Sequence, residues 1–440
     1  MALHRKQDYV AAAALYQQVL VNDPSSVQAW TNLGVALRKL THYQSALNCQ
    51  LRALELTPDN GLVLNNLANV YKDVNQLEDS VRCAERACEL EPNNNGYWFN
   101  LAVNLREAKK YNRALEVLET CISLDPASKP KYEWEMALCH LYLDNISAGW
   151  QAYRSRLETG VLPRREFACA QWTGEPLTGK KVWVVTEQGF GDTFFAARYL
   201  RPLVEVGAQV IFECKQPLWR LMSCLPIQLV EPEIKKAAGE ACDYYVYLMD
   251  LPGIFDAQGW VVPSPVELKI PAVAREKFRH LIPADAGFFN VGIVWSGSET
   301  FADNLRRSPG LPHFLQLAGL PRVRLYSLQK GAREKELDQR FARSFIVDLA
   351  PHLQDFADTA AAVSQLDLIV MSDSAVAHLT ASLGKPVWNL LHSNPYWMYG
   401  LDADSTHWYP TMQFIRQHKS GDWDSVFSEV IQKLKVLLGV

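Results

Sequence analysis

Polar side chains that can take part in chemistry gather in three loops, each placed directly after a run rich in β-branched residues. The first loop, Gln188 to Thr193, contains Gly189, Gly191 and Asp192. Two glycines allow a sharp turn before a helix, whose N-terminal amides can hold negative charge from a ligand or a transition state. Asp192 lies at or near the start of that helix, where an ordinary N-cap aspartate is the alternative interpretation.

The second loop runs from Trp295 through Ser296, Gly297 and Ser298 into a polar stretch. That stretch contains Asp303, Asn304, Arg306, Arg307 and Ser308. Hydroxyl and backbone groups donate to phosphate oxygens while guanidinium groups neutralise their charge, so this loop suits a diphosphate. A solvated polar loop explains the same composition.

The third loop, Asp373 to Leu379, follows a strand-like run that ends at Ser372. It opens a helix whose first turn offers free amides, together with the Ser374 hydroxyl, to phosphate oxygens. His378 lies about one turn inside this helix. It is a candidate ligand contact, and a hydrogen-bonded core histidine is the alternative.

Alternating strands and helices are expected to position these loops. Short apolar runs predict strands at 181–186, 209–214, 228–230, 244–248, 289–295, 323–328, 344–347, 366–371 and 386–391. This alternation predicts parallel sheets with helices on both faces. A break at 263–271 divides the pattern into two Rossmann-like lobes, 180–270 and 271–440, with a ligand cleft at facing strand ends. The final helix, 423–438, is a candidate to pack back across the first lobe.

The first third of the sequence repeats every 34 residues. Pro24, Pro58, Pro92 and Pro126 follow this step, as do Trp30, Leu64, Trp98 and Tyr132. The pattern resembles the tetratricopeptide repeat, in which paired helices bury one apolar stripe and small residues let them approach closely. We expect an array over 1–160, with about three full repeats, an atypical capping unit after Tyr132, and a polar connector at 161–179.

Such an array presents a concave surface that fits a peptide or helix of a protein partner. A pure dimerisation device is the alternative. Met1 to Leu3 aligns with Val35 to Leu37, so the sequence begins near the end of a first helix. A start in mid-unit exposes an apolar face, which suggests truncation, a partner, or a homo-oligomer formed through the array.

Composition excludes several classes of protein. A net charge of -4 gives no general attraction to nucleic acid. Nine scattered cysteines without a CxxC pair argue against zinc and disulfides, and buried free thiols favour a cytoplasmic location. The sequence contains neither a signal segment nor an apolar run of about 18 residues, so we expect no membrane span.

The α/β part resembles the ADP-heptose lipopolysaccharide heptosyltransferase superfamily, within the GT-B glycosyltransferases. The resemblance rests on the Gly-x-Gly-Asp turn at 189–192 and on Asp373-Ser374-x-x-x-His378-Leu379 leading to Gly384-Lys385-Pro386. It covers roughly Lys180 to the C-terminus. The fold expected for the chain is therefore an all-α tetratricopeptide superhelix followed by an α/β GT-B fold of two Rossmann-like lobes.

The resemblance also implies roles for individual residues. Asp192 takes the position of the proposed base, and Ser296, Asp373, Ser374 and His378 lie where the family holds a nucleotide diphosphate. Two departures stand out: Ala375 replaces a usual glycine, and the phosphate-loop lysine has no clear counterpart except Arg306 or Arg307. Gln329 and Lys330, after a predicted strand, are further candidates to reach the nucleotide.

These features predict an inverting, metal-independent glycosyltransferase that uses a nucleotide sugar as substrate and no cofactor. Asp192 would take a proton from the acceptor hydroxyl, while arginine and helix amides stabilise the departing diphosphate. Fusions of this plan resemble protein-modifying glycosyltransferases, including those that modify flagellin, which favours a protein acceptor. A non-catalytic scaffold or sugar-nucleotide sensor, and a transferase acting on lipopolysaccharide, are the alternatives.

Overall fold

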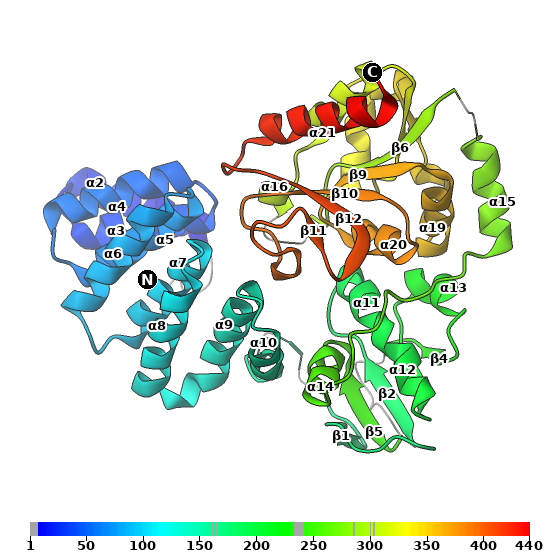
Figure 1. The fold of residues 1–440 in the computed structure, drawn as a ribbon. Helices are drawn as coiled ribbons and strands as arrows, with labels where there is room; N and C mark the ends of the chain where they lie inside the picture. The colour runs from blue at the N-terminus through cyan, green and yellow to red at the C-terminus, as the bar shows by residue number, and fades with distance from the viewer. Residues whose placement is uncertain are drawn as a thin grey trace. The chain divides into compact units, whose positions relative to one another are not determined.

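The computed structural model describes residues 8–160, 162–163, 165–232, 242–284, 287–299, 301 and 304–440. The chain divides into two units, Met1–Val161 and Leu162–Val440 (Figure 1). Met1 to Leu3 and Asp303, which entered the sequence analysis, lie outside the described residues.

The first unit is an array of antiparallel helices. Its α-helices are α2 (Tyr9–Asn22), α3 (Val27–Lys39), α4 (Tyr43–Leu56), α5 (Gly61–Asp73), α6 (Leu77–Leu90), α7 (Asn95–Glu107), α8 (Tyr111–Leu124), α9 (Lys129–Tyr142) and α10 (Ile146–Tyr153). The four periodic prolines lie between the second helix of one unit and the first helix of the next. Two residues after Pro24 and Pro58, Ser26 and Asn60 cap α3 and α5 through their side chains.

Small residues bring the helices of each pair together. Ala36, Ala46 and Ala53 are fully buried, and so is Ala87, one repeat after Ala53. A Cβ atom added at Gly34 would lie 2.4 Å from the Gln50 side-chain nitrogen on the paired helix. The 34-residue period of the sequence therefore corresponds to close packing between neighbouring helices.

The second unit begins with a parallel sheet of five strands in the order β1-β5-β2-β3-β4. The strands are β1 (Ala170–Gln171), β2 (Lys181–Val185), β3 (Gln209–Glu213), β4 (Gln228–Val230) and β5 (Tyr244–Tyr247). Strand β1 lies within the segment predicted as a connector, and it pairs with β5. Trp172, which follows β1, is buried, so this segment is built into the first lobe.

A second sheet has seven strands in the order β11-β12-β10-β9-β6-β7-β8. The strands are β6 (Phe289–Val294), β7 (Val323–Ser327), β8 (Ile346–Asp348), β9 (Leu368–Ser372), β10 (Val387–Leu391), β11 (Ser405–Thr406) and β12 (Tyr409–Arg416). Only the β11–β12 pair is antiparallel. The sequence analysis did not predict β11 or β12.

Helices flank both sheets (Figure 1). Those of the first lobe are α11 (Phe190–Ala196), α12 (Leu200–Glu205), α13 (Trp219–Met222) and α14 (Leu251–Ala257). Those that follow are α15 (Ala272–Leu281), α16 (Asn304–Arg307), α17 (Leu311–Leu315), α18 (Glu336–Gln339), α19 (Phe356–Gln365), α20 (Ala375–Ser382) and α21 (Trp423–Leu438). Two sheets flanked in this way form the two Rossmann-like lobes of a GT-B plan.

The final helix, α21, does not use its apolar face to cover the first lobe, as we had considered. Trp423, Phe427 and Leu434 on this face belong to the hydrophobic core of the second lobe, together with strand residues of β6 and β9. Phe427 packs edge-on against Phe314 of α17, with ring centroids 4.9 Å apart. The apolar stripe of α21 thus packs against the strands and helices of the second lobe.

The two lobes meet where α11 lies beside α20 and where α13 approaches α19 (Figure 1). The Phe356 ring of α19 contacts the rings of Phe190 and Phe194 of α11. Arg220 of α13 forms ion pairs with Asp355, at 3.0 Å, and with Asp358, at 2.5 Å. Aromatic and ionic contacts therefore hold the lobes together beside the third loop.

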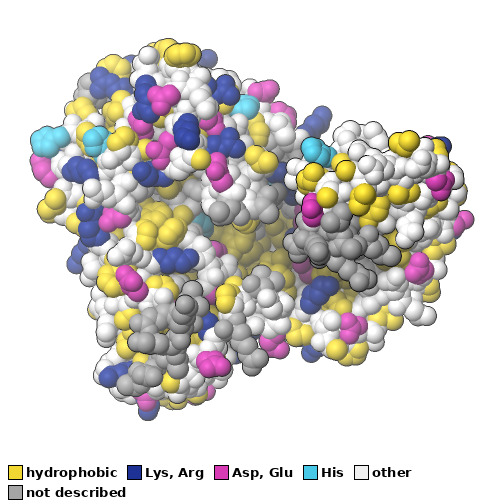
Figure 2. Space-filling model, turned by 180° about the vertical axis from the view of Figure 1, so that it is seen from behind, with side chains coloured by type: hydrophobic (Ala, Val, Ile, Leu, Met, Phe, Trp, Pro, Cys, Tyr) yellow, Lys and Arg dark blue, Asp and Glu magenta, His cyan; other side chains and the backbone are white. Residues whose placement is uncertain are grey.

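Acidic and basic side chains are interspersed over the coloured part of the face shown in Figure 2. They do not gather there into the single basic patch that binding to nucleic acid requires. No helix among the described residues is both long and apolar enough to cross a membrane.

Candidate active site

The first loop places Asp192 at the third residue of α11, with Gly189 as the N-cap. The Asp192 Oδ2 atom accepts a hydrogen bond from the Gly189 backbone N–H at 3.2 Å. Asp192 is thus not itself the N-cap, although its carboxylate stabilises the start of the helix from within. Its second oxygen, Oδ1, accepts from the Tyr396 hydroxyl of the second lobe at 3.4 Å.

Gly191 lets this turn approach the second lobe closely. A Cβ atom at Gly191 would lie 3.1 Å from His378 Cδ2 and 3.7 Å from the Ala375 Cα atom of α20. A side chain at this position would be tight against the His378 ring, so the glycine favours close approach of the two helices. Asp192 therefore lies at the edge of the first lobe that faces the third loop.

The environment of Asp192 changes its acidity. Burial raises the pKa of this carboxyl group to about 6, the charge of Asp373 acts in the same direction, and the hydrogen bond from Gly189 opposes them. A carboxylate with a pKa near 6 is a stronger base than an exposed aspartate and is still mostly ionised at neutral pH. The geometry and the pKa of Asp192 both suit a general base.

The third loop presents unoccupied donors at the start of α20. Ser374 is the N-cap of this helix, but its side chain makes no capping hydrogen bond. The Ser374 Oγ atom is buried and has no hydrogen-bond partner within the described part of the chain. Together with the first-turn amides, this hydroxyl can donate to an anionic ligand.

The second loop converges on the third through Arg307. Its Nη1 atom lies 3.9 Å from Asp373 Oδ2, and both side chains are 14% exposed. A Cβ atom at Gly297 would lie 2.4 Å from Arg307 Nη2, so the glycine leaves room for the guanidinium group. Arg307 also stacks on the Phe301 ring at 4.3 Å. The guanidinium group of Arg307 is thus held beside Asp373.

Ser296 and Gln329 support this loop from beneath. The Ser296 hydroxyl is buried and contacts Asn304, at 3.0 Å, and Ser308, at 3.4 Å. Gln329 Oε1 accepts from the backbone N–H groups of Trp295 and Ser296, and its Nε2 donates to backbone carbonyls. Both polar atoms of the Gln329 amide therefore form hydrogen bonds within the protein. The amide fixes the loop, whereas we had predicted that it reaches the nucleotide.

Two other predicted contacts lie apart from this cluster. Lys330 is exposed, and its ammonium group donates to the Ala350 carbonyl at 3.0 Å. Arg306 is exposed, whereas its neighbour Arg307 is half-buried beside Asp373. Consecutive residues of a short helix point in different directions, so only one arginine of the pair can face Asp373.

His378 differs from the prediction that it contacts nucleotide. It is 6% exposed, and its Nδ1 and Nε2 atoms lie 3.3 Å and 3.2 Å from the hydroxyls of Tyr409 and Tyr399. Burial lowers the pKa of His378 to about 4, so the ring is neutral at physiological pH. Since both ring nitrogens have protein partners, the alternative of a hydrogen-bonded core histidine describes it better.

Sequence reasoning missed the tyrosines of this site. Tyr396 and Tyr399 follow β10, and Tyr409 begins β12. The Tyr399 hydroxyl donates to Asp373 Oδ1 at 2.6 Å. The available signal was an aromatic-rich segment, 396–399, in the loop that follows β10, where ligand-contacting loops of an α/β sheet lie.

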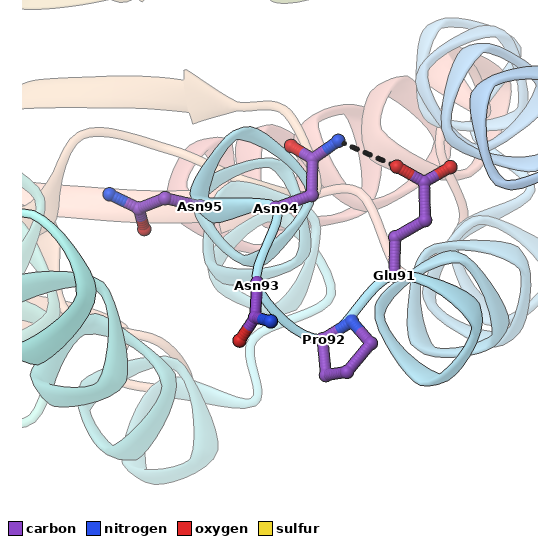
Figure 3. Close-up of a pocket in the computed structure, with 5 residues that line it drawn as sticks. All are labelled: Glu91, Pro92, Asn93, Asn94 and Asn95. Atoms are coloured by element: carbon purple, nitrogen blue, oxygen red, sulfur yellow. Dashed lines mark hydrogen bonds between the residues drawn. The ribbon is translucent and has the colours of Figure 1, made fainter.

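A separate hollow of about 600 Å³ lies in the repeat array at the loop between α6 and α7 (Figure 3). Asn94 donates to Glu91 across it at 3.1 Å, as the dashed line marks. Glu91 is the one ionisable group among its five lining residues.

No group of three or more histidine, cysteine, aspartate or glutamate side chains within the described ranges is arranged to hold a metal ion. The nine cysteines, which all fall in those ranges, are free thiols.

Comparisons with known proteins agree with this division. Sequence models of the tetratricopeptide repeat match residues 27–60, 63–94 and 96–128. The model of glycosyltransferase family 9 (heptosyltransferase) matches residues 313–394, which include the second-lobe loop of Asp373 and Ser374. Protein FlbA of Caulobacter vibrioides is 23% identical over 459 residues, covering 96% of this chain and 75% of that protein.

Solved structures also match part of the chain. MamA of Desulfovibrio magneticus, from residue 41 to its end, is 16% identical and covers 36% of this chain and 89% of its own, with a TM-score of 0.33. YrrB, described as a tetratricopeptide-repeat protein with an unusual peptide-binding site, is 19% identical and covers 36% and 81%, with a TM-score of 0.32. The chain is thus similar to tetratricopeptide repeats over 27–128 and to glycosyltransferase family 9 (heptosyltransferase) over 313–394, and it resembles Protein FlbA along most of its length.

Proposed function

We propose that the protein is an active, inverting glycosyltransferase that moves a sugar from a nucleotide sugar to a protein acceptor without a metal ion. The observation that carries the proposal is the position of Asp192, which faces the start of α20 across the contact between lobes. A base on one lobe and anion-binding groups on the other are the two components that direct displacement at an anomeric carbon requires.

The donor diphosphate binds the second lobe in this proposal. Ser374 Oγ and the first-turn amides of α20 donate to phosphate oxygens, and Arg307 balances their charge. Asp373 is a carboxylate and would repel phosphate, so it accepts hydrogen bonds from hydroxyl groups of the sugar. Ser374, the first-turn amides of α20 and Arg307 would supply the stabilisation of the leaving group that a divalent cation provides in other transferases.

The chemical step is a single displacement. Asp192 removes the proton of the acceptor hydroxyl while its oxygen attacks the anomeric carbon. The bond from that carbon to the diphosphate breaks, and the nucleoside diphosphate leaves with the bonding electron pair. Attack from the face opposite the leaving group inverts the configuration.

The repeat array supports a protein acceptor. Asn32, Asn66 and Asn100 follow the 34-residue step on the first helices α3, α5 and α7, and all three are half-buried. A primary amide both donates and accepts hydrogen bonds, so a row of them suits the backbone of an extended peptide whatever its side chains. A lipid-linked acceptor offers no such repeating backbone.

Nucleotide-sugar binding and turnover test the proposal. Thermal shift with ADP-, UDP-, GDP- and CDP-sugars should select a donor, because a ligand that binds the folded state raises the unfolding temperature. Transfer to peptide or protein acceptors is then followed by mass spectrometry in EDTA, and the anomeric configuration of the product by NMR. Donor binding without turnover on any acceptor supports a sensor instead, and loss of turnover in EDTA contradicts metal independence.

The acceptor is tested with the full chain in which Asn32, Asn66 and Asn100 are changed to alanine. We expect weaker use of a protein acceptor, seen as a higher KM, and unchanged affinity for the donor. Equal turnover of a lipid-linked acceptor by this variant and the wild type, with no protein acceptor found, would favour the lipopolysaccharide alternative.

A further inference from the structure

A line of hydrogen-bonding side chains runs from the start of β12 to the donor site. Tyr409, His378, Tyr399 and Asp373 follow one another along it, with separations of 3.3, 3.2 and 2.6 Å. Tyr409 and Tyr399 are at most 1% exposed and His378 is 6% exposed. Only Asp373, at the end of the line, is partly accessible.

The direction of the protons follows from the types of the groups. A carboxylate oxygen only accepts, so the single hydroxyl proton of Tyr399 is donated to Asp373. The Tyr399 oxygen must then accept from His378, which places the imidazole proton on Nε2. The bare Nδ1 of the neutral ring accepts in turn from the Tyr409 hydroxyl. Each group therefore donates its proton to the next group towards Asp373. The hydrogen bonds cannot all run the other way, because the carboxylate of Asp373 has no proton to donate.

The Tyr409 end of the line is anchored in the interior. The Arg198 guanidinium group lies over the Tyr409 ring, with its central carbon 4.8 Å from the ring centroid. Arg198 is 3% exposed and donates to the backbone carbonyls of Phe195, Pro263 and Trp408. It thus binds the first lobe, the segment between the lobes, and the residue that immediately precedes Tyr409.

The Tyr399 end is also fixed from the backbone. Arg416 of β12 donates to the carbonyls of Tyr399, Gly400 and Ala403, at 2.5, 3.2 and 2.9 Å. The Tyr399 ring packs edge-on against Phe414, with centroids 5.1 Å apart. Backbone and ring are thus both immobilised, so the hydroxyl has one position from which to donate.

We propose that Tyr399 is a positioning residue whose hydroxyl, held by His378 and Tyr409, fixes the Asp373 carboxylate for the hydroxyl groups of the donor sugar. This inference rests on the proposed function and adds to it a role for three residues that touch neither phosphate nor acceptor. It also assigns His378 the task of supplying an N–H to Tyr399.

The test compares donor binding by wild type and Tyr399→Phe, which removes one hydroxyl and keeps the ring. The probes are the nucleotide sugar that gives the largest thermal shift and the free diphosphate of the same nucleoside. A hydrogen bond to a charged group contributes enough that we expect the Kd of the nucleotide sugar to rise about tenfold. The Kd of the free diphosphate should change by less than about twofold, because Asp373 contacts the sugar.

A double-mutant cycle separates positioning from general damage. Tyr399→Phe should have little further effect in an Asp373→Asn background, since the hydroxyl acts through that carboxylate. Tyr199→Phe is the matched control: it removes a hydroxyl from a tyrosine 1% exposed in the first-lobe core, against Phe255, and should bind both probes as wild type does.

A second pair of variants guards against misfolding of Tyr399→Phe. His378→Gln retains an N–H donor near the position of Nε2, whereas His378→Ala removes the donor that His378 supplies to the Tyr399 oxygen. The glutamine variant should bind the nucleotide sugar about threefold more tightly than the alanine variant.

The possible results separate the two proposals. Wild-type affinity in Tyr399→Phe, equal loss for both probes, additive effects in the cycle, or no advantage of glutamine over alanine would each overturn the positioning role. Failure of wild type to bind any nucleotide sugar of the panel would instead overturn the proposed function, and the inference would fall with it.

Discussion

The repeat array and the α/β unit place their polar groups by different means. In the array, Arg38 of α3 pairs with Asp73 of α5, and Asn100 of α7 donates to Asn65 of α5 at 2.8 Å, so partners lie about one repeat apart. In the α/β unit, the Tyr396 hydroxyl reaches Asp192, 204 residues earlier in the chain. Periodic packing makes a surface by repetition, whereas a reaction site is assembled once from distant segments.

The two regions also use glycine differently. Gly34 of the array lies against the buried Gln50 side chain, which donates to the Thr31 carbonyl, on the paired helix of the same repeat. Gly191 lies against a histidine ring that two tyrosines hold, on the opposite lobe. Close approach serves helix pairing in the first case and the meeting of base and donor groups in the second. The predictions below test this distinction.

The largest effect is expected for Asp192→Asn. Asparagine keeps the shape and can still accept from Gly189, but it cannot take a proton. A general base typically contributes a factor of about 10² to 10⁴, so kcat should fall by at least about 10² with donor affinity unchanged. Steady-state kinetics with the selected donor measures this change. Turnover within about threefold of wild type would remove Asp192 from the reaction.

The next effect concerns Gly191→Ala, with Gly34→Ala as its counterpart in the array. A methyl group at Gly191 has to displace the held His378 ring, and such overpacking costs about 1–3 kcal/mol. We expect kcat/KM to fall about tenfold, because the lobes can no longer approach as closely. Gly34→Ala should lower the unfolding temperature of the array and leave donor binding intact. If the two variants affect donor binding equally, the distinction between the glycines is wrong.

A smaller effect is expected for the ion pairs that join elements within each unit. Arg220→Met removes the contact of α13 with Asp355 and Asp358, while Lys277 remains 3.2 Å from Asp358. Arg220 is 44% exposed, so solvent screens its attraction for Asp358, and Lys277 still balances that buried carboxylate in the variant. We expect the KM for the donor to rise about threefold. The difference between variant and wild type should be smaller at high salt, which screens these ion pairs. Arg38→Met is the control and should leave this KM unchanged.

The smallest effect is a pH dependence of stability. Because burial raises the folded-state pKa of Asp192 to about 6, the folded protein holds this proton more tightly than the unfolded chain does. The resulting stabilisation is complete below the unfolded pKa, near 4, and is lost as pH rises through about 6. Asp192→Asn should therefore unfold a few degrees higher than wild type at pH 8 and at the same temperature at pH 4. Calorimetry at both values checks this. A difference that is the same at both values contradicts the assignment.

The fold of both regions was accessible from local sequence patterns. The 34-residue step predicted the helix pairs, and short apolar runs predicted most strands of both sheets within a few residues. Strand β12 was missed because Tyr409 to Arg416 contains Pro410 and several polar residues, which argue against a buried strand. Helix α21 was identified, but its partner was not, because an apolar stripe does not specify what covers it.

The residues of the candidate site also differ in how far the sequence could predict their contacts. Asp192, Asp373 and Ser374 were predicted from the sequence because each follows a strand end near the start of a helix, and their roles stay predictions. Gln329 and Lys330 fit that rule equally well, yet their polar groups bind backbone carbonyls and amides nearby. A position in the sequence indicates which loop a side chain occupies. It does not specify which groups that side chain faces.

The sequence alone determined the repeat array, the alternation of strand and helix, and the three loops, because each depends on residues that are close together in the chain. The tertiary structure alone decided that Arg307 and not Arg306 approaches Asp373, and that His378 bonds to two tyrosines. It also brought Asp192 to the edge of the third loop. These contacts join residues far apart in the sequence, and they form only when the two lobes pack around α11 and α20.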